Sequence, residues 1–481
     1  MDVAERVVWF GFLWACFSFI LHEIWLSRLP VFVAPPVPAI VTNPRSLHQR
    51  FHEPNRLDAS SCAHDLSFDV YQDWMKQGVL LANGITKLVC FPMVIPGSPG
   101  PTQPNTFCEA RNLAVDFSKF SAADTLSFRP GYKSGDGDTY FQYEPGAFFG
   151  SCSRTSQWDS SLFPADHFKD MFNAFECDVR DLPSIGMKVE HPVLFVAREK
   201  GEHRNAFHAT TDFMNAFIML ELFDLLPLEV QVLILDNHPP SALDDFWNRV
   251  ISKKEPFAKS IDYSNQVVLF SRVIFSPPGY SNVFYPGLNS LQHCLERVPL
   301  FSGFSHFVKE SFNVSVPPVS DSLKVLVIDR KPRLPLYPKM SRQFSDTDSV
   351  KRTLLLAGES LSVPVHVSVE DFATRSLEEQ IQISASHDIM VGIHGAALTH
   401  AFWLPQSGGL IELRPNSNQD WFCFAHLAHY RGLQYDIWFN SDSGRIHLDD
   451  SGELIDVDLN FLAQASRKMY SQVIERKSSG L

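Results

Sequence analysis

The stretch DIMVGIHGAALTH, residues 388–400, carries the strongest indication of the fold in this chain. Its first half is an apolar run that predicts a buried strand ending near Gly392, and its second half turns through small residues into a helix. Such a unit is typical of a doubly wound α/β domain, in which ligands bind at the carboxyl ends of parallel strands. Free amides at the start of a helix suit a diphosphate. The alternative is a turn that is tight only for packing. The candidate residues are His394, Gly395, Ala396 and Ala397.

Apolar runs alternate with helical patterns on both sides of this stretch. Before residue 311 we expect strands at residues 191–197, 231–236 and 266–275, with a long helix at 207–226. After residue 322 we expect strands at 323–329, 363–369, 388–393, 409–413 and 433–438, and helices near 377–386, after 394 and at 421–430. The alternation predicts an α/β protein with parallel, doubly wound sheets, in two Rossmann-like domains facing a central cleft. Residues 50–180 give no clear assignment.

The start of the chain predicts how these domains are attached to a membrane. Residues 7–21 are uncharged and apolar, Trp9 and Trp25 bracket them, and a proline-rich stretch follows. We expect one membrane-spanning signal-anchor helix, with a cleaved signal peptide as the alternative. The predicted parts are a short tail and anchor at 1–28, a stem at 29–60, an N-terminal Rossmann-like domain with an irregular start at 61–315, and a C-terminal Rossmann-like domain at 316–481.

Composition excludes some classes of function. The formal net charge of −13 argues against a nucleic-acid binder, which needs a basic surface. Five of the eight cysteines lie between residues 62 and 177, which predicts local disulfides in an oxidising compartment, with the pairing open and at least one thiol free. No CxxC or zinc-type spacing occurs. Asp136 and Asp138 form a D-x-D pattern that is frequent by chance, so we expect no metal site.

Charged residues follow two other strands of the second series. Arg330 and Lys331 come after the strand at 323–329, and arginine can bind a phosphate through two parallel hydrogen bonds. Glu412 closes the strand at 409–413, where a carboxylate suits ribose or sugar hydroxyls. The alternatives are a solvated basic turn for the cations and a surface residue at a strand end for Glu412.

The long helix at 207–226 begins with a polar face. A histidine and a carboxylate one turn apart on this face form a candidate acid–base pair, although an acidic helix N-terminus is the plainer interpretation. The residues of this face are His208, Thr211, Asp212 and Asn215, and Asn205 precedes them.

These residues resemble motifs of glycosyltransferase family 61, which holds plant-type β-1,2-xylosyltransferases, the EGF-domain O-GlcNAc transferase and xylan arabinosyltransferases. Residues 391–400 resemble its G-x-H-G-A-G-L-T-[HN] motif, with Ala397 in place of the usual second glycine. Residues 427–435 resemble the segment after its last helix. In the N-terminal domain the likeness is to the xylosyltransferase branch, at 108–112, 205–208 with 211–212, and 276–280 with 287–288. It runs from about 108 to 440.

The resemblance implies a GT-B fold, inversion at the anomeric carbon, and a UDP-pentose or UDP-HexNAc donor without an obligatory metal or other cofactor. The C-terminal domain is then the donor side, with Arg330, Lys331, His394, Gly395, Ala396, Ala397 and Glu412 as donor-binding residues. The N-terminal domain is the acceptor side, with Asn205, Thr211 and Asn215. The catalytic base is Asp212 or His208, and we expect Asp212 first because a carboxylate is the commoner base in inverting transferases.

The expected function is transfer of a sugar, xylose first, from a UDP-sugar to a glycan or glycoprotein, including β-1,2-xylosylation of the N-glycan core. Two alternatives are a protein O-GlcNAc or arabinosyl transferase of the same family and an inactive lumenal glycan-binding or scaffold protein. A short anchor and a proline-rich stem are the layout of a type II enzyme of the Golgi or endoplasmic reticulum. The expected partners are the donor, the acceptor and the membrane.

Overall fold

A computed structural model of the chain describes residues 61–93, 105–122, 141–159, 167–177, 182, 185–198, 203–285, 287, 290–291, 294–315, 321–332, 339–415 and 421–479. All of them belong to one compact unit, Ser46–Leu481. The expected signal-anchor helix at 1–28 and the stem at 29–60 lie outside the described residues. Within those ranges, no helix is both long enough and apolar enough to cross a membrane.

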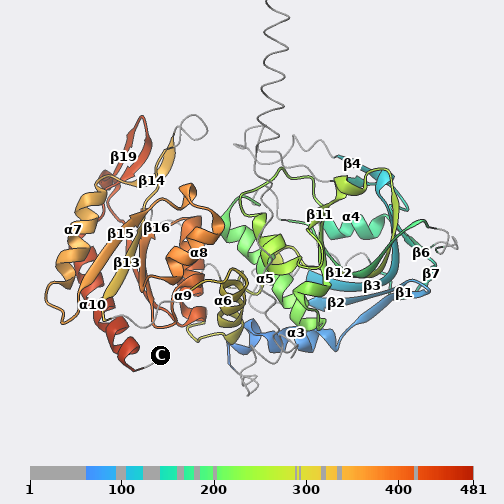
Figure 1. Cartoon of the computed structure of the whole chain (residues 1–481), viewed down its shortest axis with the longest axis horizontal. Helices are drawn as coiled ribbons and strands as arrows, with labels where there is room; N and C mark the ends of the chain where they lie inside the picture. Colours follow the sequence, from blue (N-terminus) through green and yellow to red (C-terminus); the bar gives the residue numbers. More distant parts are fainter. Residues whose placement is uncertain are drawn as a thin grey trace, which may run out of the picture. The chain divides into compact units, whose positions relative to one another are not determined.

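The C-terminal part contains a five-stranded sheet, the second sheet, in which all neighbouring strands are parallel (Figure 1). In order across the sheet, the strands are β15 (Val365–Glu370), β13 (Leu323–Ile328), β16 (Ile389–Ile393), β17 (Gly409–Arg414) and β18 (Gln434–Phe439). β16 and β17 are buried along their whole length, as strands covered on both faces should be. The five predicted strands are therefore confirmed, with ends that differ by at most two residues.

Helices cover both faces of the second sheet (Figure 1). One face carries α7 (Thr347–Gly358) and α10 (Leu459–Ser478). The other carries α8 (Leu377–Ala385), the 3₁₀ helix η10 (Ala396–Trp403) and α9 (Cys423–Arg431). A small sheet of β14 (Met340–Phe344), β20 (Gly452–Ile455) and β19 (Ile446–Asp449) completes this part. The helix expected after residue 394 is thus present in its tighter, 3₁₀ form.

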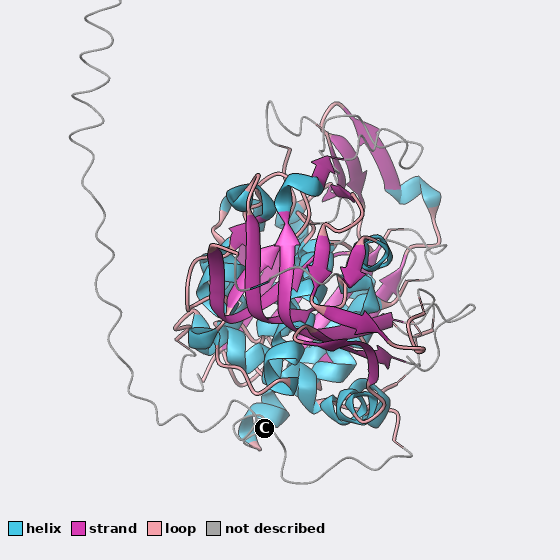
Figure 2. Cartoon of the chain, turned by 90° about the vertical axis from the view of Figure 1, so that its right-hand side faces the viewer, coloured by secondary structure: helices cyan, strands magenta, loops and turns pink. Residues whose placement is uncertain are grey.

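The N-terminal part contains a mixed sheet, the first sheet, whose twisted strands are seen in Figure 2 with helices packed against them. Its main path is β11 (Ala258–Lys259), β10 (Gln231–Ile234), β9 (Met187–Val196), β12 (Val267–Phe275), β3 (Asn105–Asp116), β2 (Lys87–Met93), β1 (Val79–Gly84) and β7 (Cys152–Arg154). The short strands β6 (Phe148–Gly150) and β8 (Phe175–Cys177) pair beside β3, and β4 (Phe120–Ala122) pairs with β5 (Phe141–Tyr143). Short helices α3 (Phe68–Met75) and α4 (His167–Asn173) accompany it.

The prediction of parallel strands is confirmed in this part only for the three strands that were expected, β9, β10 and β12. On the main path the block from β11 to β12 is parallel, and from β12 through β3 to β7 every pair is antiparallel. The antiparallel strands come from the region that gave no clear assignment. β2 shows why, because exposed and partly buried positions interrupt its apolar residues. Antiparallel strands can leave one face solvated and then lack the continuous apolar run of a parallel strand.

The two sheets share a continuous core built around α5 (Ala206–Leu222) and α6 (Pro299–Ser311) (Figure 1). α5 is buried on almost every side beyond its first turn, which its apolar sequence explains. The Phe217 ring lies 5.6 Å from that of Phe304 and 4.9 Å from that of Phe307 on α6, centroid to centroid. On the other side of α6, Phe301 stacks on Phe402 of η10 at 5.8 Å. The domain boundary at 315/316 stays a prediction.

Three disulfides brace the N-terminal part. Cys90–Cys108 joins β2 to β3, Cys152–Cys177 joins β7 to β8, and Cys62–Cys294 closes a separation of 232 residues. Two of the three therefore lie in the region where local disulfides were expected, and the third is long-range. Among the described cysteines Cys423 is free, and it is buried.

Candidate active site

A cavity of about 320 Å³ lies where the N-terminus of α5 meets the carboxyl edge of the second sheet. This edge is where ligands bind in open α/β sheets. Aromatic rings and a few polar groups form the walls, as in most small-molecule sites. The lining residues are Asn205, Phe207, His208, Arg342, His394, Gly395, Ala396, Trp421, Cys423 and Phe424. Residues from both sides of the predicted cleft thus meet at one cavity.

His394 stands directly after β16 and is held from several directions. Its backbone N–H donates to the Leu413 carbonyl at 2.9 Å, and its carbonyl accepts from Arg342 Nη1 at 2.8 Å. The ring Nδ1 lies 2.5 Å from Glu412 Oε1, and the ring contacts Phe424 at 5.1 Å between centroids. The position of this imidazole in the cavity wall is therefore tightly fixed.

Glu412 does not reach the cavity. Its side chain has no exposed surface, and Tyr435 Oη donates to its Oε2 at 2.6 Å while its Oε1 faces His394. The equally buried Arg414 places Nε 3.7 Å from Oε1. With both oxygens occupied, Glu412 is a support for His394 rather than a group that could bind ribose directly.

Two arginines adjoin the cavity at the turn of Gly395. Nη1 of Arg330 is buried and has no hydrogen-bond partner in the described part of the chain, and a Cβ added to Gly395 would lie 3.2 Å from it. Arg342 sits on β14 with φ of +61°, a conformation that a side-chain-bearing residue rarely adopts. Such backbone strain concentrates at functional positions.

Carboxylates act on the two guanidinium groups only from beyond ion-pair distance among the described residues, Asp371 on Arg330 and Glu453 on Arg342. Among the residues that the structure describes, neither Arg330 nor Arg342 forms an ion pair with a carboxylate. Burial, followed by repulsion from Arg342, lowers the pKa of Arg330, and burial lowers the pKa of Arg342 as well. Partly buried cations of this kind, beside the first amides of η10, form a positive site that an anion would stabilise.

Only one of the three remaining predicted donor-binding residues lines the cavity. Ala396 lines the cavity, whereas Ala397 packs against the core behind it. Lys331 has a side chain that is 56% exposed and pairs with Asp329 Oδ2 at 2.7 Å, so it does not line the cavity.

On the opposite wall, α5 presents two of the predicted residues. Asn205 caps the helix, since its side chain accepts from the Phe207 N–H at 3.0 Å, and it also lines the cavity. His208 lines the cavity, and its Nδ1 lies 2.9 Å from Tyr285 Oη.

The other polar residues of α5 face the turn at Gly279 instead. A Cβ added to Gly279 would lie 2.6 Å from Thr211 Oγ1 and 2.8 Å from Asp212 Oδ1, so any other residue there would force these side chains to shift. Asn215 donates to the carbonyls of Pro277 and Pro278 at 3.0 and 2.9 Å. Asp212 is only 2% exposed. The structure thus brings His208 to the cavity and leaves Thr211, Asp212 and Asn215 behind it.

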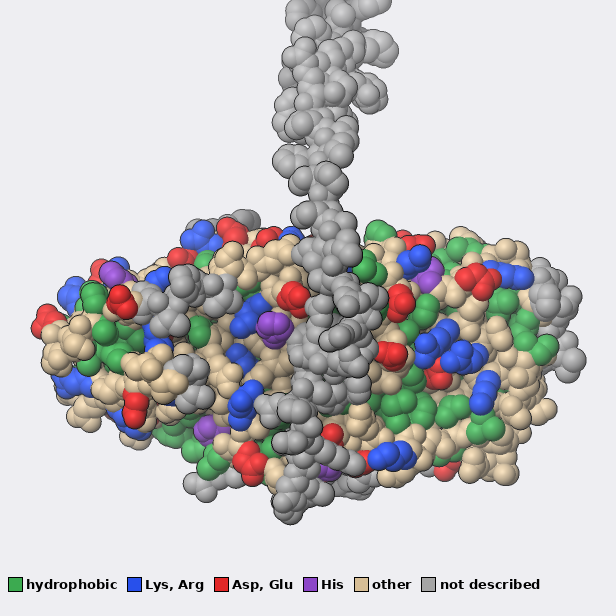
Figure 3. Space-filling model, turned by 60° about the horizontal axis from the view of Figure 1, so that its bottom comes forward, with side chains coloured by type: hydrophobic (Ala, Val, Ile, Leu, Met, Phe, Trp, Pro, Cys, Tyr) green, Lys and Arg blue, Asp and Glu red, His purple; other side chains and the backbone are tan. Residues whose placement is uncertain are grey.

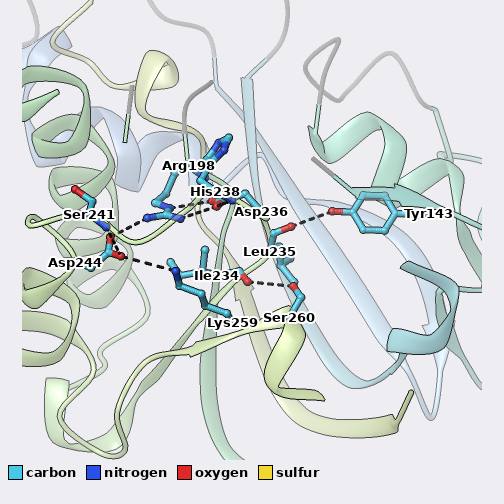
Figure 4. Close-up of polar contacts among 10 residues, drawn as sticks. All are labelled: Tyr143, Arg198, Ile234, Leu235, Asp236, His238, Ser241, Asp244, Lys259 and Ser260. Carbon is cyan, nitrogen blue, oxygen red and sulfur yellow. Dashed lines mark hydrogen bonds and ion pairs between the residues drawn. The ribbon is translucent and has the colours of Figure 1, made fainter. Parts of the chain in front are cut away.

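A separate cluster of buried charges occupies the carboxyl ends of β9 and β10 (Figure 4). Arg198 donates from Nε and Nη2 to the two oxygens of Asp236, at 3.0 and 2.7 Å, and from Nη1 to Asp244 at 2.8 Å. Burial raises the pKa of Asp236, but the charge of Arg198 outweighs it and holds that pKa well below its usual value. The His203 and His238 rings stack beside this cluster at 4.8 Å.

Sequence reasoning missed Arg342, Phe424 and Tyr435. Arg342 lies on a short strand that the hydrophobic pattern does not predict, and its left-handed backbone conformation cannot be predicted from the sequence. Phe424 and Tyr435 fall in the predicted last helix and last strand, where an aromatic residue looks like core. Tyr435 and Glu412 lie far apart in sequence, so no local pattern predicts their hydrogen bond.

Among the described residues, no group of three or more His, Cys, Asp or Glu side chains is placed to hold an ion. Asp136 and Asp138 lie outside the described residues. On the face seen in Figure 3, basic and acidic side chains are interspersed. That face offers no continuous basic surface for a nucleic acid.

Comparisons with known proteins agree with the motifs of the cavity. A model of the family described as Glycosyltransferase 61 matches residues 206–411, which include α5, β16 and η10. Among curated proteins, the chain is 24% identical over 344 residues to an EGF domain-specific O-linked N-acetylglucosamine transferase of Gallus gallus, covering 69% of this chain and 59% of that protein. It is 26% identical over 263 residues to the protein of the same name from Xenopus laevis, covering 53% of this chain and 46% of that one.

A plant relative is equally similar. The chain is 25% identical over 275 residues to a beta-1,2-xylosyltransferase of Oryza sativa subsp. japonica, covering 51% of this chain and 49% of the relative. The chain therefore spans about half to three fifths of the length of these relatives. Together with the His394–Gly395–Ala396 turn at the cavity, the family match over residues 206–411 and these relatives show that the chain is similar to glycosyltransferase family 61.

Proposed function

We propose that this chain is an inverting glycosyltransferase that moves a sugar from a UDP-sugar to a glycan or glycoprotein. The observation that carries the proposal is the pair Arg330 and Arg342, two cations without carboxylate partners among the described residues, at the Gly395 turn. Across the same cavity stands His208. A site for a diphosphate and a proton acceptor thus face each other.

The donor diphosphate binds to the two arginines and the first amides of η10. Arginine recognises phosphate oxygens through short, charge-assisted hydrogen bonds. The helix N-terminus adds partial positive charge. These groups stabilise the charge that develops on UDP as it leaves, without a divalent cation. In this arrangement the second sheet with its helices is the donor side of a GT-B fold and the first sheet is the acceptor side.

Transfer then proceeds by one displacement. The acceptor hydroxyl oxygen forms a bond to the anomeric carbon while the bond from that carbon to UDP breaks, and the hydroxyl proton passes to a base. His208 is the better candidate because it lines the cavity, whereas Asp212 is turned toward Gly279. A neutral histidine is well matched to this task at neutral pH. Asp212 remains the alternative base.

UDP-xylose is the donor that we propose first, with the N-glycan core as acceptor. Support comes from the segments that resemble the xylosyltransferase branch and from the similarity to the Oryza sativa relative. A second candidate is UDP-N-acetylglucosamine with a protein acceptor, which the names of the Gallus gallus and Xenopus laevis relatives favour.

We further propose that the domain works in the lumen of the Golgi or endoplasmic reticulum, held by the N-terminal apolar segment. The three disulfides support this location, since such bonds persist in oxidising compartments. Protease protection in sealed microsomes tests it. Digestion of the large domain without detergent would contradict a lumenal position.

The activity is tested with full-length protein in detergent, by measuring UDP release from UDP-xylose, UDP-arabinose and UDP-N-acetylglucosamine. Each donor is offered with an N-glycan, an EGF-domain protein and no acceptor. The expected result is acceptor-dependent UDP release from UDP-xylose with the N-glycan, abolished in His208→Ala. Release only with the EGF-domain protein and UDP-N-acetylglucosamine would select the second candidate. Binding of UDP without turnover of any donor would make the chain an inactive lumenal binding protein.

A further inference from the structure

The triad of Glu412, His394 and Tyr435 begins at His394 in the cavity wall and continues behind it to the fully buried Glu412, and its geometry determines which hydrogen bonds His394 can make. Glu412 and Tyr435 have no role in the transfer as described so far. The inference rests on the proposed function, because it concerns what His394 contacts in a bound donor.

The charge state of Glu412 follows from Arg414. Arg414 is fully buried and always carries a positive charge, and a buried charge is stable only beside a counter-charge. In the described part of the chain, Glu412 is the carboxylate that lies within 4 Å of it. Glu412 is therefore ionised, and an ionised carboxylate only accepts hydrogen bonds.

Glu412 determines that Nδ1 of His394 carries a hydrogen. Because the carboxylate only accepts, the hydrogen in the 2.5 Å contact belongs to Nδ1 of His394. The Tyr435 hydroxyl donates to the other oxygen at 2.6 Å, so the carboxylate cannot rotate away. A neutral imidazole with hydrogen on Nδ1 has a lone pair on Nε2.

A neutral ring with hydrogen on Nδ1 cannot bind a phosphate oxygen through Nε2 but can bind a hydroxyl. Phosphate oxygens at neutral pH only accept hydrogen bonds, so the accepting Nε2 of a neutral His394 has nothing to offer them. A sugar hydroxyl can donate to it. The diphosphate is left to Arg330 and Arg342, whose guanidinium groups are donors only.

We propose that Glu412, braced by Tyr435, is a positioning residue that fixes His394 with its hydrogen on Nδ1, so that Nε2 accepts a hydrogen bond from a hydroxyl of the donor's sugar. His394 thereby distinguishes a UDP-sugar from UDP alone. This proposal narrows the predicted donor-binding role of His394 to contact with the sugar of the donor.

The first test observes the ring without any substrate. ¹⁵N NMR of histidine-labelled full-length protein in detergent distinguishes the two neutral tautomers, and a His394→Gln variant identifies the signals. We expect hydrogen on Nδ1 in the wild type and loss of this single state in Glu412→Gln. Hydrogen on Nε2 in the wild type overturns the proposal, whether or not the protein transfers sugar.

The second test measures affinity for UDP and for the UDP-sugar that turns over best, by calorimetry. In His394→Gln and Glu412→Gln, affinity for the UDP-sugar should fall by about threefold to tenfold, the effect of losing one neutral hydrogen bond, while affinity for UDP stays unchanged. Equal loss for both ligands would make His394 a diphosphate ligand and overturn the inference.

Tyr435→Phe keeps the measurement interpretable if Glu412→Gln folds poorly, because it removes one bond to the carboxylate and leaves the charge in place. We expect a smaller loss of UDP-sugar affinity, an unchanged affinity for UDP, and a rise in KM with little change in kcat. An effect on thermal stability alone, with ligand affinities and tautomer as in the wild type, would assign the triad a purely structural role and contradict the proposal.

Discussion

The arginines at the carboxyl ends of the parallel strands are paired differently in the two sheets. At the carboxyl ends of β9 and β10, Arg198 is engaged by Asp236 and Asp244 through all three guanidinium nitrogens, and we call this the closed edge. At the carboxyl ends of β13 and β16, Arg330 and Arg342 lie beside a cavity without ion pairs in the described part of the chain, and we call this the open edge. The strand topology of an α/β sheet indicates where a ligand can bind, but the pairing of charges decides which edge accepts an anion.

The strongest test of the comparison removes one partner at the closed edge. Asp236→Ala removes the fully buried partner of Arg198, leaves Asp244 as its remaining ion-pair partner, and should lower the free energy of unfolding by about 3–5 kcal/mol. Chemical denaturation of the purified protein measures this. Asp245→Ala, at a partly exposed carboxylate nearby, is the control and should have little effect. A stable Asp236→Ala protein with weakened UDP binding would mean that the closed edge is a ligand site after all.

The next test concerns the chemical step at the wall that faces the open edge. His208→Ala should lower kcat by roughly 10²-fold or more, the usual result of losing a general base, while UDP binding stays near normal. Asp212→Asn is the matched variant one turn along α5, and it should retain more activity because Asp212 faces Gly279. Steady-state kinetics with the best donor compares the two. If Asp212→Asn has the larger effect on kcat, the base is Asp212.

Weakening the open edge should act on binding rather than on folding. Arg330→Ala or Arg342→Ala removes a charge-assisted hydrogen bond, about 1.5–3 kcal/mol, and should weaken UDP binding by about tenfold or more. The free energy of unfolding should not fall in Arg330→Ala, because that variant relieves a cation whose Nη1 has no partner, whereas Arg342→Ala also loses the hydrogen bond to the His394 carbonyl and should be slightly less stable. Arg352→Ala, an exposed arginine on α7, controls for net charge. Unchanged UDP affinity in both cavity variants would remove the open edge from the donor site.

The closed edge should also respond to acid. Burial, and then the neighbouring His238 and Arg198, lower the pKa of His203 from 6.5 to about 3. Since the unfolded state binds this proton more readily, the stability that a neutral His203 provides is present above pH 6.5 and is lost as pH falls toward 3. The slope approaches about 1.4 kcal/mol per pH unit. Denaturation at several pH values should show a shallower slope in His203→Phe, and an identical slope would contradict this assignment.

The smallest expected change comes from one methyl group at the open edge. Gly395→Ala places a Cβ 3.2 Å from Arg330 Nη1, closer than most such contacts. The backbone of Gly395 is extended at φ of 167°, so the effect is crowding and not strain. We expect UDP affinity to fall by about twofold to fivefold, or roughly 0.4–1 kcal/mol. Tighter binding would show that Arg330 moves without loss.

Much of the second sheet is predictable from sequence because its strands are buried runs of a single type. The run IMVGI in β16 and the turn from His394 to Ala396 were located from residue types alone. The first sheet was predictable only over its parallel block, since β1 to β8 are short or have exposed and partly buried positions among their apolar residues.

Individual site residues were less predictable than the turn that carries them. Helical spacing correctly grouped His208 and Asp212 one turn apart, but which of them reaches the cavity depends on the loop at Gly279, which packs against the same helix. Glu412 was located at a strand end, yet its burial behind His394 follows from Tyr435 and Arg414, contacts that no local pattern encodes.

The helix α5 makes occupancy of the cavity a property of the whole unit. Its first turn forms part of the cavity wall, and its later turns pack Phe217 against the rings of α6, within the core that joins both sheets. A ligand that contacts this first turn therefore stabilises every element that packs against the helix. Binding and unfolding are linked by mass action, so a saturating ligand should raise the melting temperature of the unit as a whole, in one cooperative transition. Variation along the buried face of α5 would alter ligand affinity and cooperativity together, which leaves this helix less room to diverge than the strands at the far end of the first sheet.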